Sequence, residues 1–337
     1  MRYNNFEKDG INCMNYDNKK YIIATDYIQL DVNSDVSAAI QELIDSNPNR
    51  TIFFPDGEYY LEHPILTPAH PNKSVDLQLS NFACFKASPQ WSTAEAMIRL
   101  GAKDEANNIS VPGSNYGICG GIIDGSGVAK ALSIDGGRET YVRNVNIKNA
   151  LIGLHIKRGV NSGSSDADIS SVNIVGNGSL DSIGVLIEGF DNTLTNLRIA
   201  NVFTGVDVRS GGNMLRNVHP LFYLKEDHYN ESVGFAVRNP MNWFDYCYSD
   251  QFAVGFYTTG GGIYKNCFCW WYSDKELMHV ALRSSEAFFG SIDTLTIGGQ
   301  HHPENYNQFM ESDNVSEAAV IKNVVLLSNH GKPQVIK

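Results

Sequence analysis

Two acidic residues, Glu188 and Asp207, hold related places in a phrase that recurs along the chain. The phrase is seven residues long, as in GVLIEGF at 184–190 and GVDVRSG at 205–211. It opens on a small residue, alternates apolar residues with others and closes on a turn former. Two carboxyl groups that flank a glycosidic bond can cleave it, with one of them acting as the acid. Glu188 and Asp207 are therefore the predicted catalytic pair.

Other copies of the phrase place further polar residues beside this pair. Alternate residues of a strand point to opposite faces, so Val206 and Val208 should face the core while Asp207 and Arg209 face outward. Every copy treated in this way contributes to two outward columns. The first column comprises Ser133, His155, Leu186, Asp207, Ala236, Tyr257 and Ala281. The second comprises Asp135, Lys157, Glu188, Arg209, Arg238, Thr259 and Arg283.

The starts of the phrase indicate the fold that carries these columns. They fall at residues 131, 153, 184, 205, 234, 255 and 279, so neighbouring copies lie 21 to 31 residues apart. A fixed minimum spacing with occasional insertions is typical of a solenoid. The sequence YSD, at 248–250 and again at 272–274, supports an offset of 24 residues for the last interval. A second strand precedes most copies, with Asn at bends that favour left-handed backbone.

One amphipathic segment, residues 34–48, predicts a helix that begins at Ser34 or Asp35 and stops at a proline. Parallel coils leave an open apolar end, and a helix directly before the first coil would cover it. We expect residues 1–33 to be an N-terminal extension. Residues 34–337 should form a single domain that includes this helix.

The predicted helix is followed by TIFFPDGEYYLEHPI at 51–65, by GGIIDGSG at 120–127 and by asparagine-rich coils. Over residues 20–330 the chain thus resembles the right-handed parallel β-helix superfamily of pectate lyases and polygalacturonases. The resemblance implies an all-β fold, a single-stranded right-handed parallel β-helix of about ten coils. The superfamily contains hydrolases, lyases, transferases, epimerases, esterases and phage tailspikes, so the resemblance does not choose the reaction.

The polygalacturonases of this superfamily carry catalytic aspartates in the patterns N-T-D and G-D-D, close to the start of such strands. SLDSIGVLI at 179–187 is similar to the first pattern through Asp181, which becomes the reserve catalytic residue. Phe203 and Thr204 stand where the paired aspartates are expected, and an R-I-K signature is absent. Only Asp181 is carried over from the resemblance.

The spacing of Glu188 and Asp207 leaves the chemistry open, because their Cα atoms should lie roughly 8 Å apart. Retaining glycosidases hold their carboxyl groups at about 5 Å and inverting ones at up to about 9.5 Å. We expect a glycoside hydrolase or glycosyl transferase without a cofactor. One alternative is a lyase, whose arginines would clamp a uronate and which would add Ca²⁺ as a cofactor. Another is a non-catalytic glycan-binding or tailspike-like protein.

Further side chains would orient the oligo- or polysaccharide. Aromatic rings stack on the apolar faces of sugars, and the insertions at 160–168 and 222–232 would wall off a groove. The expected substrate-binding residues are His155, Lys157, Arg209, Arg238, Tyr257, Trp271, Arg283 and His228. The competing interpretation is a solvated face whose charges pair across rungs, as Lys157, Glu188 and Arg209 would.

The composition excludes several partner classes. A net charge of −11 argues against nucleic acids and anionic membranes, and no apolar run is long enough to span a bilayer. The N-terminal residues lack the apolar stretch of a signal peptide, so we expect a cytoplasmic protein, or a secreted one if a leader was removed. Cys267 and Cys269 alternate in an apolar run and are predicted to be free core thiols, with no metal site. The resemblance also implies a homo-trimer.

Overall fold

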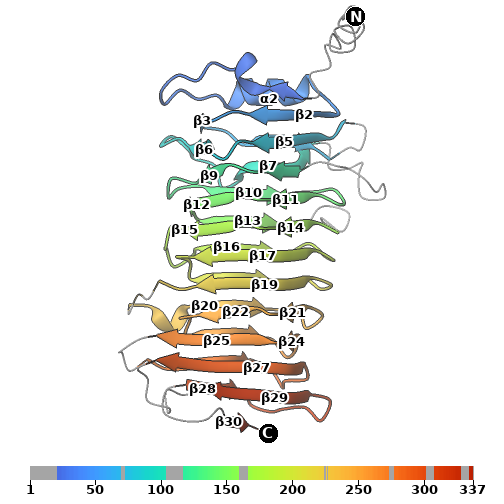
Figure 1. Cartoon of the computed structure of the whole chain (residues 1–337), viewed down its shortest axis with the longest axis vertical. Helices are drawn as coiled ribbons and strands as arrows, with labels where there is room; N and C mark the ends of the chain where they lie inside the picture. Colours follow the sequence, from blue (N-terminus) through green and yellow to red (C-terminus); the bar gives the residue numbers. More distant parts are fainter. Residues whose placement is uncertain are drawn as a thin grey trace, which may run out of the picture.

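The computed structural model describes residues 21–69, 73–103, 117–158, 166–223, 225, 227–272, 277–300, 307–327 and 334–336. Its strands wind into a stack of coils along one long axis (Figure 1). The strands pair in parallel except for the antiparallel pair β29–β30. The predicted all-β, right-handed parallel β-helix is confirmed.

Each coil contributes one strand to a ten-stranded sheet, here named the heptad sheet because it carries the repeated phrase. Its strands are β4 (Ile65–Pro68), β7 (Ala96–Lys103), β10 (Lys130–Ile134), β13 (Ile152–Ile156), β16 (Ile183–Ile187), β18 (Thr204–Val208), β20 (Val233–Val237), β23 (Val254–Thr258), β26 (His279–Ser284) and β28 (Asn307–Glu311).

The remaining strands form a 20-stranded sheet, here named the bent sheet, which most coils cross as two short strands or one long one. They are β1 (Ile22–Ile23), β2 (Arg50–Phe54), β3 (Gly57–Leu61), β5 (Val75–Leu79), β6 (Ala83–Ala87), β8 (Gly117–Cys119), β9 (Ile122–Asp124), β11 (Tyr141–Arg143), β12 (Asn146–Ala150), β14 (Asp168–Ser170), β15 (Asn173–Gly176), β17 (Thr193–Ala200), β19 (Met214–Leu221), β21 (Trp243–Asp245), β22 (Tyr248–Asp250), β24 (Ile263–Lys265), β25 (Cys267–Tyr272), β27 (Ser291–Gln300), β29 (Val320–Leu327) and β30 (Gln334–Ile336). Three helical segments complete the chain: η1 (Ala24–Asp26), α2 (Ser37–Asp45) and η4 (Tyr229–Glu231).

Asparagine side chains set both kinds of turn in the coils. The bend of the bent sheet has left-handed residues with φ between 51° and 59°, and these are Asn144, Ser171, Asn196, Asn217, Tyr246 and Asn266. At the turn that follows the heptad sheet, the buried Asn213 accepts a hydrogen bond from the backbone N–H of Asn192 at 3.1 Å. Asn242 accepts in the same way from Asn213 at 3.0 Å. The expectation that asparagine marks the bends is confirmed.

Helix α2 lies over the N-terminal end of the stack, where the buried Ile40, Leu43 and Ile44 join the core (Figure 1). It begins at Ser37, later than predicted, because Asp35 forms a parallel bridge with Tyr60 and the chain is still extended there. It ends at Asp45, before the predicted end at residue 48. The residue before a proline disfavours the helical conformation. Among the described residues, no helix has the length and apolar character needed to span a bilayer.

The repeated phrase opens on glycine because the two sheets approach each other there. A Cβ atom on Gly205 would lie 2.5 Å from Cβ of Pro220 in the bent sheet and 2.4 Å from the carbonyl oxygen of Gly234. Val206 and Val208 are fully buried, so the predicted alternation of inward and outward residues is confirmed for this strand.

The predicted register of the last interval is wrong. Tyr257 pairs with Arg283, an offset of 26 residues, and Tyr248 pairs with Phe268, an offset of 20. The extra residues therefore lie between β25 and β26, where the sequence repeat YSD has no bearing on the pairing. Arg283 follows Tyr257 in the first column, and Ala281 is a fully buried residue opposite Gly255.

Candidate functional site

Five of the predicted site residues meet on the outer face of the heptad sheet, in a network here named the charged ladder. Its residues are His155, Glu188, Asp207, Arg209 and Arg238. Nε2 of His155 lies 2.9 Å from one oxygen of Glu188, and Arg209 donates to the other at 3.1 Å. Arg209 also donates from Nε to Asp207 at 3.0 Å, and Arg238 donates to the second Asp207 oxygen at 2.8 Å. Strand alternation thus brings these side chains together as predicted.

The carboxylate of Asp207 is covered although it points outward. Its side chain is only 2% exposed, whereas Arg209 and Arg238 above it are 43% and 47% exposed. Both carboxylate oxygens accept hydrogen bonds from these guanidinium groups. A substrate would have to displace an arginine to reach Asp207.

Glu188 and His155 influence each other's protonation. Partial burial raises the pKa of Glu188, but the hydrogen bond and charge of His155 and the charge of Arg209 outweigh it, so the pKa lies below its ordinary value. Burial lowers the pKa of His155 more than Glu188 raises it. At neutral pH, Glu188 is therefore ionised beside a neutral imidazole, which suits a base or an ion-pair partner and does not suit a general acid.

Lys157 belongs to a second group of charges, towards the N-terminal end of the same face. It donates to Asp135 at 2.9 Å and to Glu95 at 2.7 Å, and Arg99 joins the same Asp135 oxygen. The interpretation as a paired face expected Lys157 to pair with Glu188, and no such ion pair occurs among the described residues. Towards the C-terminal end of this face, Arg283 pairs with Glu311 at 2.9 Å.

A cleft of about 640 Å³, here named the loop cleft, opens between the loop before β16 and the 222–232 insertion. It is lined by Gly178, Ser179, Leu180, Phe203, Lys225, Asp227 and His228. Lys225 donates to the carbonyl oxygen of Gly178 and lies 5.8 Å from the ring centre of Phe203. Asp181, the reserve catalytic residue, is exposed and follows Leu180 directly. The 222–232 insertion thus walls off a hollow as predicted, whereas most of the 160–168 insertion lies outside the described residues.

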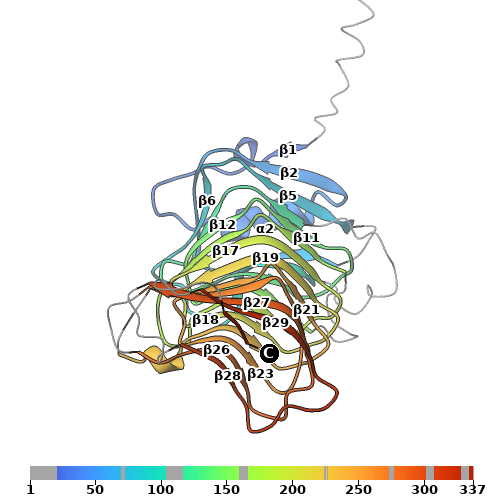
Figure 2. The ribbon, with the colours of Figure 1, turned by 60° about the horizontal axis from the view of Figure 1, so that its bottom comes forward.

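The wall formed by this insertion is anchored in the core. Tyr229 of η4 is 2% exposed, and its hydroxyl lies 2.5 Å from Nδ1 of the buried His279. Burial raises the pKa of Tyr229, so the phenol stays neutral. Figure 2 shows η4 projecting beyond the outline of the coils. The exposed His228 next to it lies 2.8 Å from Glu231 and has left-handed backbone.

The prediction that Trp271 is a sugar platform is wrong. Trp271 is 1% exposed, stacks on His279 and donates to the carbonyl oxygen of Phe252 at 2.6 Å. Cys267 and Cys269 are buried free thiols, as predicted, and their parity along the strand already assigns Trp271 to the core. Trp270 is the tryptophan that faces outward. Tyr257 is half-buried on the outer face of the heptad sheet, between Ala236 and Arg283.

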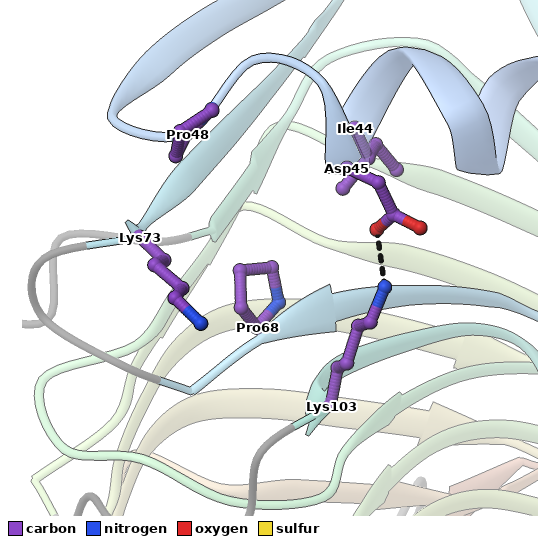
Figure 3. A pocket seen from close by; sticks show the side chains of 6 residues that line it. All are labelled: Ile44, Asp45, Pro48, Pro68, Lys73 and Lys103. Carbon is purple, nitrogen blue, oxygen red and sulfur yellow. Dashed lines mark hydrogen bonds and ion pairs between the residues drawn. The ribbon is translucent and has the colours of Figure 1, made fainter.

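Two features lie away from these residues, at the N-terminal end of the stack. Figure 3 shows a hollow of about 170 Å³ beside α2, in which Lys103 pairs with Asp45 at 2.5 Å. Asp35, Glu62 and His63 bring possible metal-ligand atoms within 4.8 Å of one another. One Asp35 oxygen already accepts hydrogen bonds from the backbone N–H groups of Ser37 and Glu62.

The fold defines the class of this protein: it is a right-handed parallel β-helix. No family model and no curated protein matches the sequence. Among solved structures, the ORF18 protein of Geobacillus virus E2 has a TM-score of 0.65 at 14% identity, over 98% of this chain and 65% of that one. The tailspike of E. coli bacteriophage HK620 in complex with a pentasaccharide has a TM-score of 0.60 at 12% identity, over 90% of this chain and 67% of that one. An alginate lyase from Paenibacillus sp. str. FPU-7 has a TM-score of 0.54 at 12% identity, over 86% of this chain and 96% of that one.

Proposed function

We propose that this protein binds an oligo- or polysaccharide in the loop cleft and cleaves or transfers its glycosidic bonds. The observation that carries the proposal is the mixed lining of the cleft, which joins Leu180 and Phe203 to the charged Lys225 and Asp227. Sugars offer both apolar C–H faces and hydroxyl groups, so they suit such walls. The fold supports the proposal, because a tailspike with the same fold was solved with a pentasaccharide.

The accessible carboxyl groups at this cleft are the best candidates for acid–base chemistry. Asp227 lines one wall, and Asp181 follows the residue that lines the other. We assign the reaction to Asp181 and Asp227, since glycoside cleavage needs two carboxyl groups that can reach the bond. Asp207 and Glu188 then act as positioning residues that hold Arg209 and Arg238 in place.

The test is a panel of oligosaccharides whose products are analysed by mass. A gain of one water in the products indicates hydrolysis, and a longer saccharide indicates transfer. Asp181→Asn and Asp227→Asn should each lower turnover by about 10²-fold or more with the fold intact. If Asp207→Asn alone abolishes turnover while both cleft variants stay active, the reaction lies on the charged ladder and our assignment is wrong.

A second candidate function is glycan binding without catalysis. It is favoured by one observation: the carboxylates of the charged ladder are all ion-paired, so none of them is held protonated as an acid. In that case no panel member changes mass, and Asp181→Asn leaves its affinity unchanged. The lyase alternative loses support, because Arg209, Arg238 and Arg283 already bind the protein's own carboxylates. An unsaturated product that absorbs ultraviolet light would restore it.

A further inference from the structure

A row of stacked rings crosses the outer face of the bent sheet, on strands β19, β22 and β25. His219 and Tyr248 are parallel, with ring centres 4.1 Å apart. The ring centre of Phe268 lies 5.0 Å from that of Tyr248, and Trp270 stacks on Phe268 at 5.8 Å. All four side chains are half-buried. We name these residues the aromatic platform.

The pairing of the strands explains why the row is continuous. Tyr248 is the register partner of Phe268, and Asp250 is the partner of Trp270, so successive coils place these side chains on one face. Towards the N-terminal end the same face is polar, with Asn146 and Asn173 at the corresponding positions. The platform is therefore a local feature of three coils and not a general property of the sheet.

The indole of Trp270 is laid across the next strand. A Cβ atom on Gly298 would lie 2.6 Å from Cζ3 of the indole, so only glycine leaves room for the ring at this place. Among the described residues, no hydrogen-bond partner is found for the indole N–H of Trp270. The ring thus covers backbone with one part of its surface and keeps a donor that the protein does not use.

A carboxylate stands within this row of rings. Asp250 is 17% exposed, and one of its oxygens accepts a hydrogen bond from the Tyr248 hydroxyl at 3.1 Å. The same oxygen lies 3.6 Å from Nε2 of His219. A partner with only apolar side chains would leave this carboxylate desolvated, which is unfavourable. A polyol would instead donate hydroxyl groups to it.

We propose that the aromatic platform is a second carbohydrate site that binds pyranose rings of an uncharged glycan. The C–H faces of the sugar would stack on Trp270 and Phe268, because an aromatic ring presents a flat apolar surface. Asp250 would accept hydrogen bonds from sugar hydroxyl groups, and its negative charge disfavours polyuronates. The inference rests on the proposed function only in taking a glycan as the ligand class, since the platform lies on a different sheet from the charged ladder.

The test measures tryptophan fluorescence during titration with hexamers of cello-, xylo-, malto- and chito-oligosaccharides and of galacturonate. Trp91 and Trp271 are buried, so Trp270 and the 40% exposed Trp243 are the two reporters available. We expect an uncharged hexamer to quench the fluorescence. Trp270→Ala should weaken its binding at least tenfold, Trp270→Phe should retain most of the affinity, and Trp243→Ala should change the affinity less than twofold.

Three results would overturn the proposal: no quenching by any uncharged hexamer, equal effects of Trp270→Ala and Trp243→Ala, or preferential binding of the galacturonate hexamer. Circular dichroism of each variant shows whether its fold is intact. Quenching through Trp270 without any turnover would support the platform and refute the proposed enzyme. Turnover without any effect at Trp270 would do the reverse, so the two failures can be told apart.

Discussion

Removal of the Asp207 carboxylate should destabilise the protein more than any exposed ion pair on the same face. The carboxylate makes three contacts of 2.8 to 3.0 Å with Arg209 and Arg238 and is 2% exposed. Each charge-assisted hydrogen bond contributes about 1.5–3 kcal/mol, and breaking a fully buried pair costs about 3–5 kcal/mol. Both arginines are nearly half exposed, so water can replace their lost partner. We therefore expect Asp207→Ala to lower the free energy of unfolding by about 2–3 kcal/mol.

The matched control is Glu311→Ala, which breaks the ion pair with Arg283 at the C-terminal end of the heptad sheet. The side chains of that pair are 53% and 38% exposed, so its loss should cost no more than about 1 kcal/mol. Urea unfolding measures both variants, and an unchanged m-value shows that the comparison concerns stability alone.

Two results would refute this reasoning. If Asp207→Ala costs no more than Glu311→Ala, the cover of arginines over Asp207 does not contribute to stability. If Asp207→Ala leaves stability unchanged and turnover is lost, Asp207 is a catalytic group and our assignment of a positioning role is wrong.

Three further predictions concern pH, the glycine corner and the core. Since burial holds the pKa of His155 below its ordinary 6.5, stability should fall as pH drops from 6.5 towards the folded-state pKa, and His155→Gln should reduce the loss measured between neutral pH and about pH 5. Gly205→Ala should cost about 1–3 kcal/mol in urea unfolding, because its Cβ would lie 2.5 Å from Pro220; Gly211→Ala, whose nearest contact is 3.2 Å, should cost less, and equal losses would contradict the explanation of the repeated glycine. Trp271→Ala should lower the thermal midpoint further than Trp270→Ala, since removing a buried tryptophan costs about 3–5 kcal/mol, and the opposite order would contradict the corrected orientation.

The sequence predicted the coils well where local geometry alone sets the pattern. Strand alternation placed Val206 and Val208 in the core and Asp207 outside, because neighbouring side chains of a strand must face opposite ways. Asparagine marked the bends, because its side chain tolerates left-handed backbone. The same parity, applied from Cys267 and Cys269, would have assigned Trp271 to the core.

The register of β26 could not be predicted in the same way. The 24-residue repeat of YSD competes with the true offset of 26 residues between Tyr257 and Arg283. Extra residues between two strands change the sequence spacing without changing which strands pair. The offset across a loop therefore depends on the packing of the coils and not on a local pattern.

The sequence by itself determined the coil, its turns and the outward direction of the charged residues, since each of these follows from the geometry of a few neighbouring residues. Only the tertiary structure decided which outward groups a ligand can reach. Asp207 points out of the sheet and is nevertheless closed off, because arginines one position and one coil away fold over it. The loop cleft and the aromatic platform likewise exist only because stacking brings side chains from separate coils together.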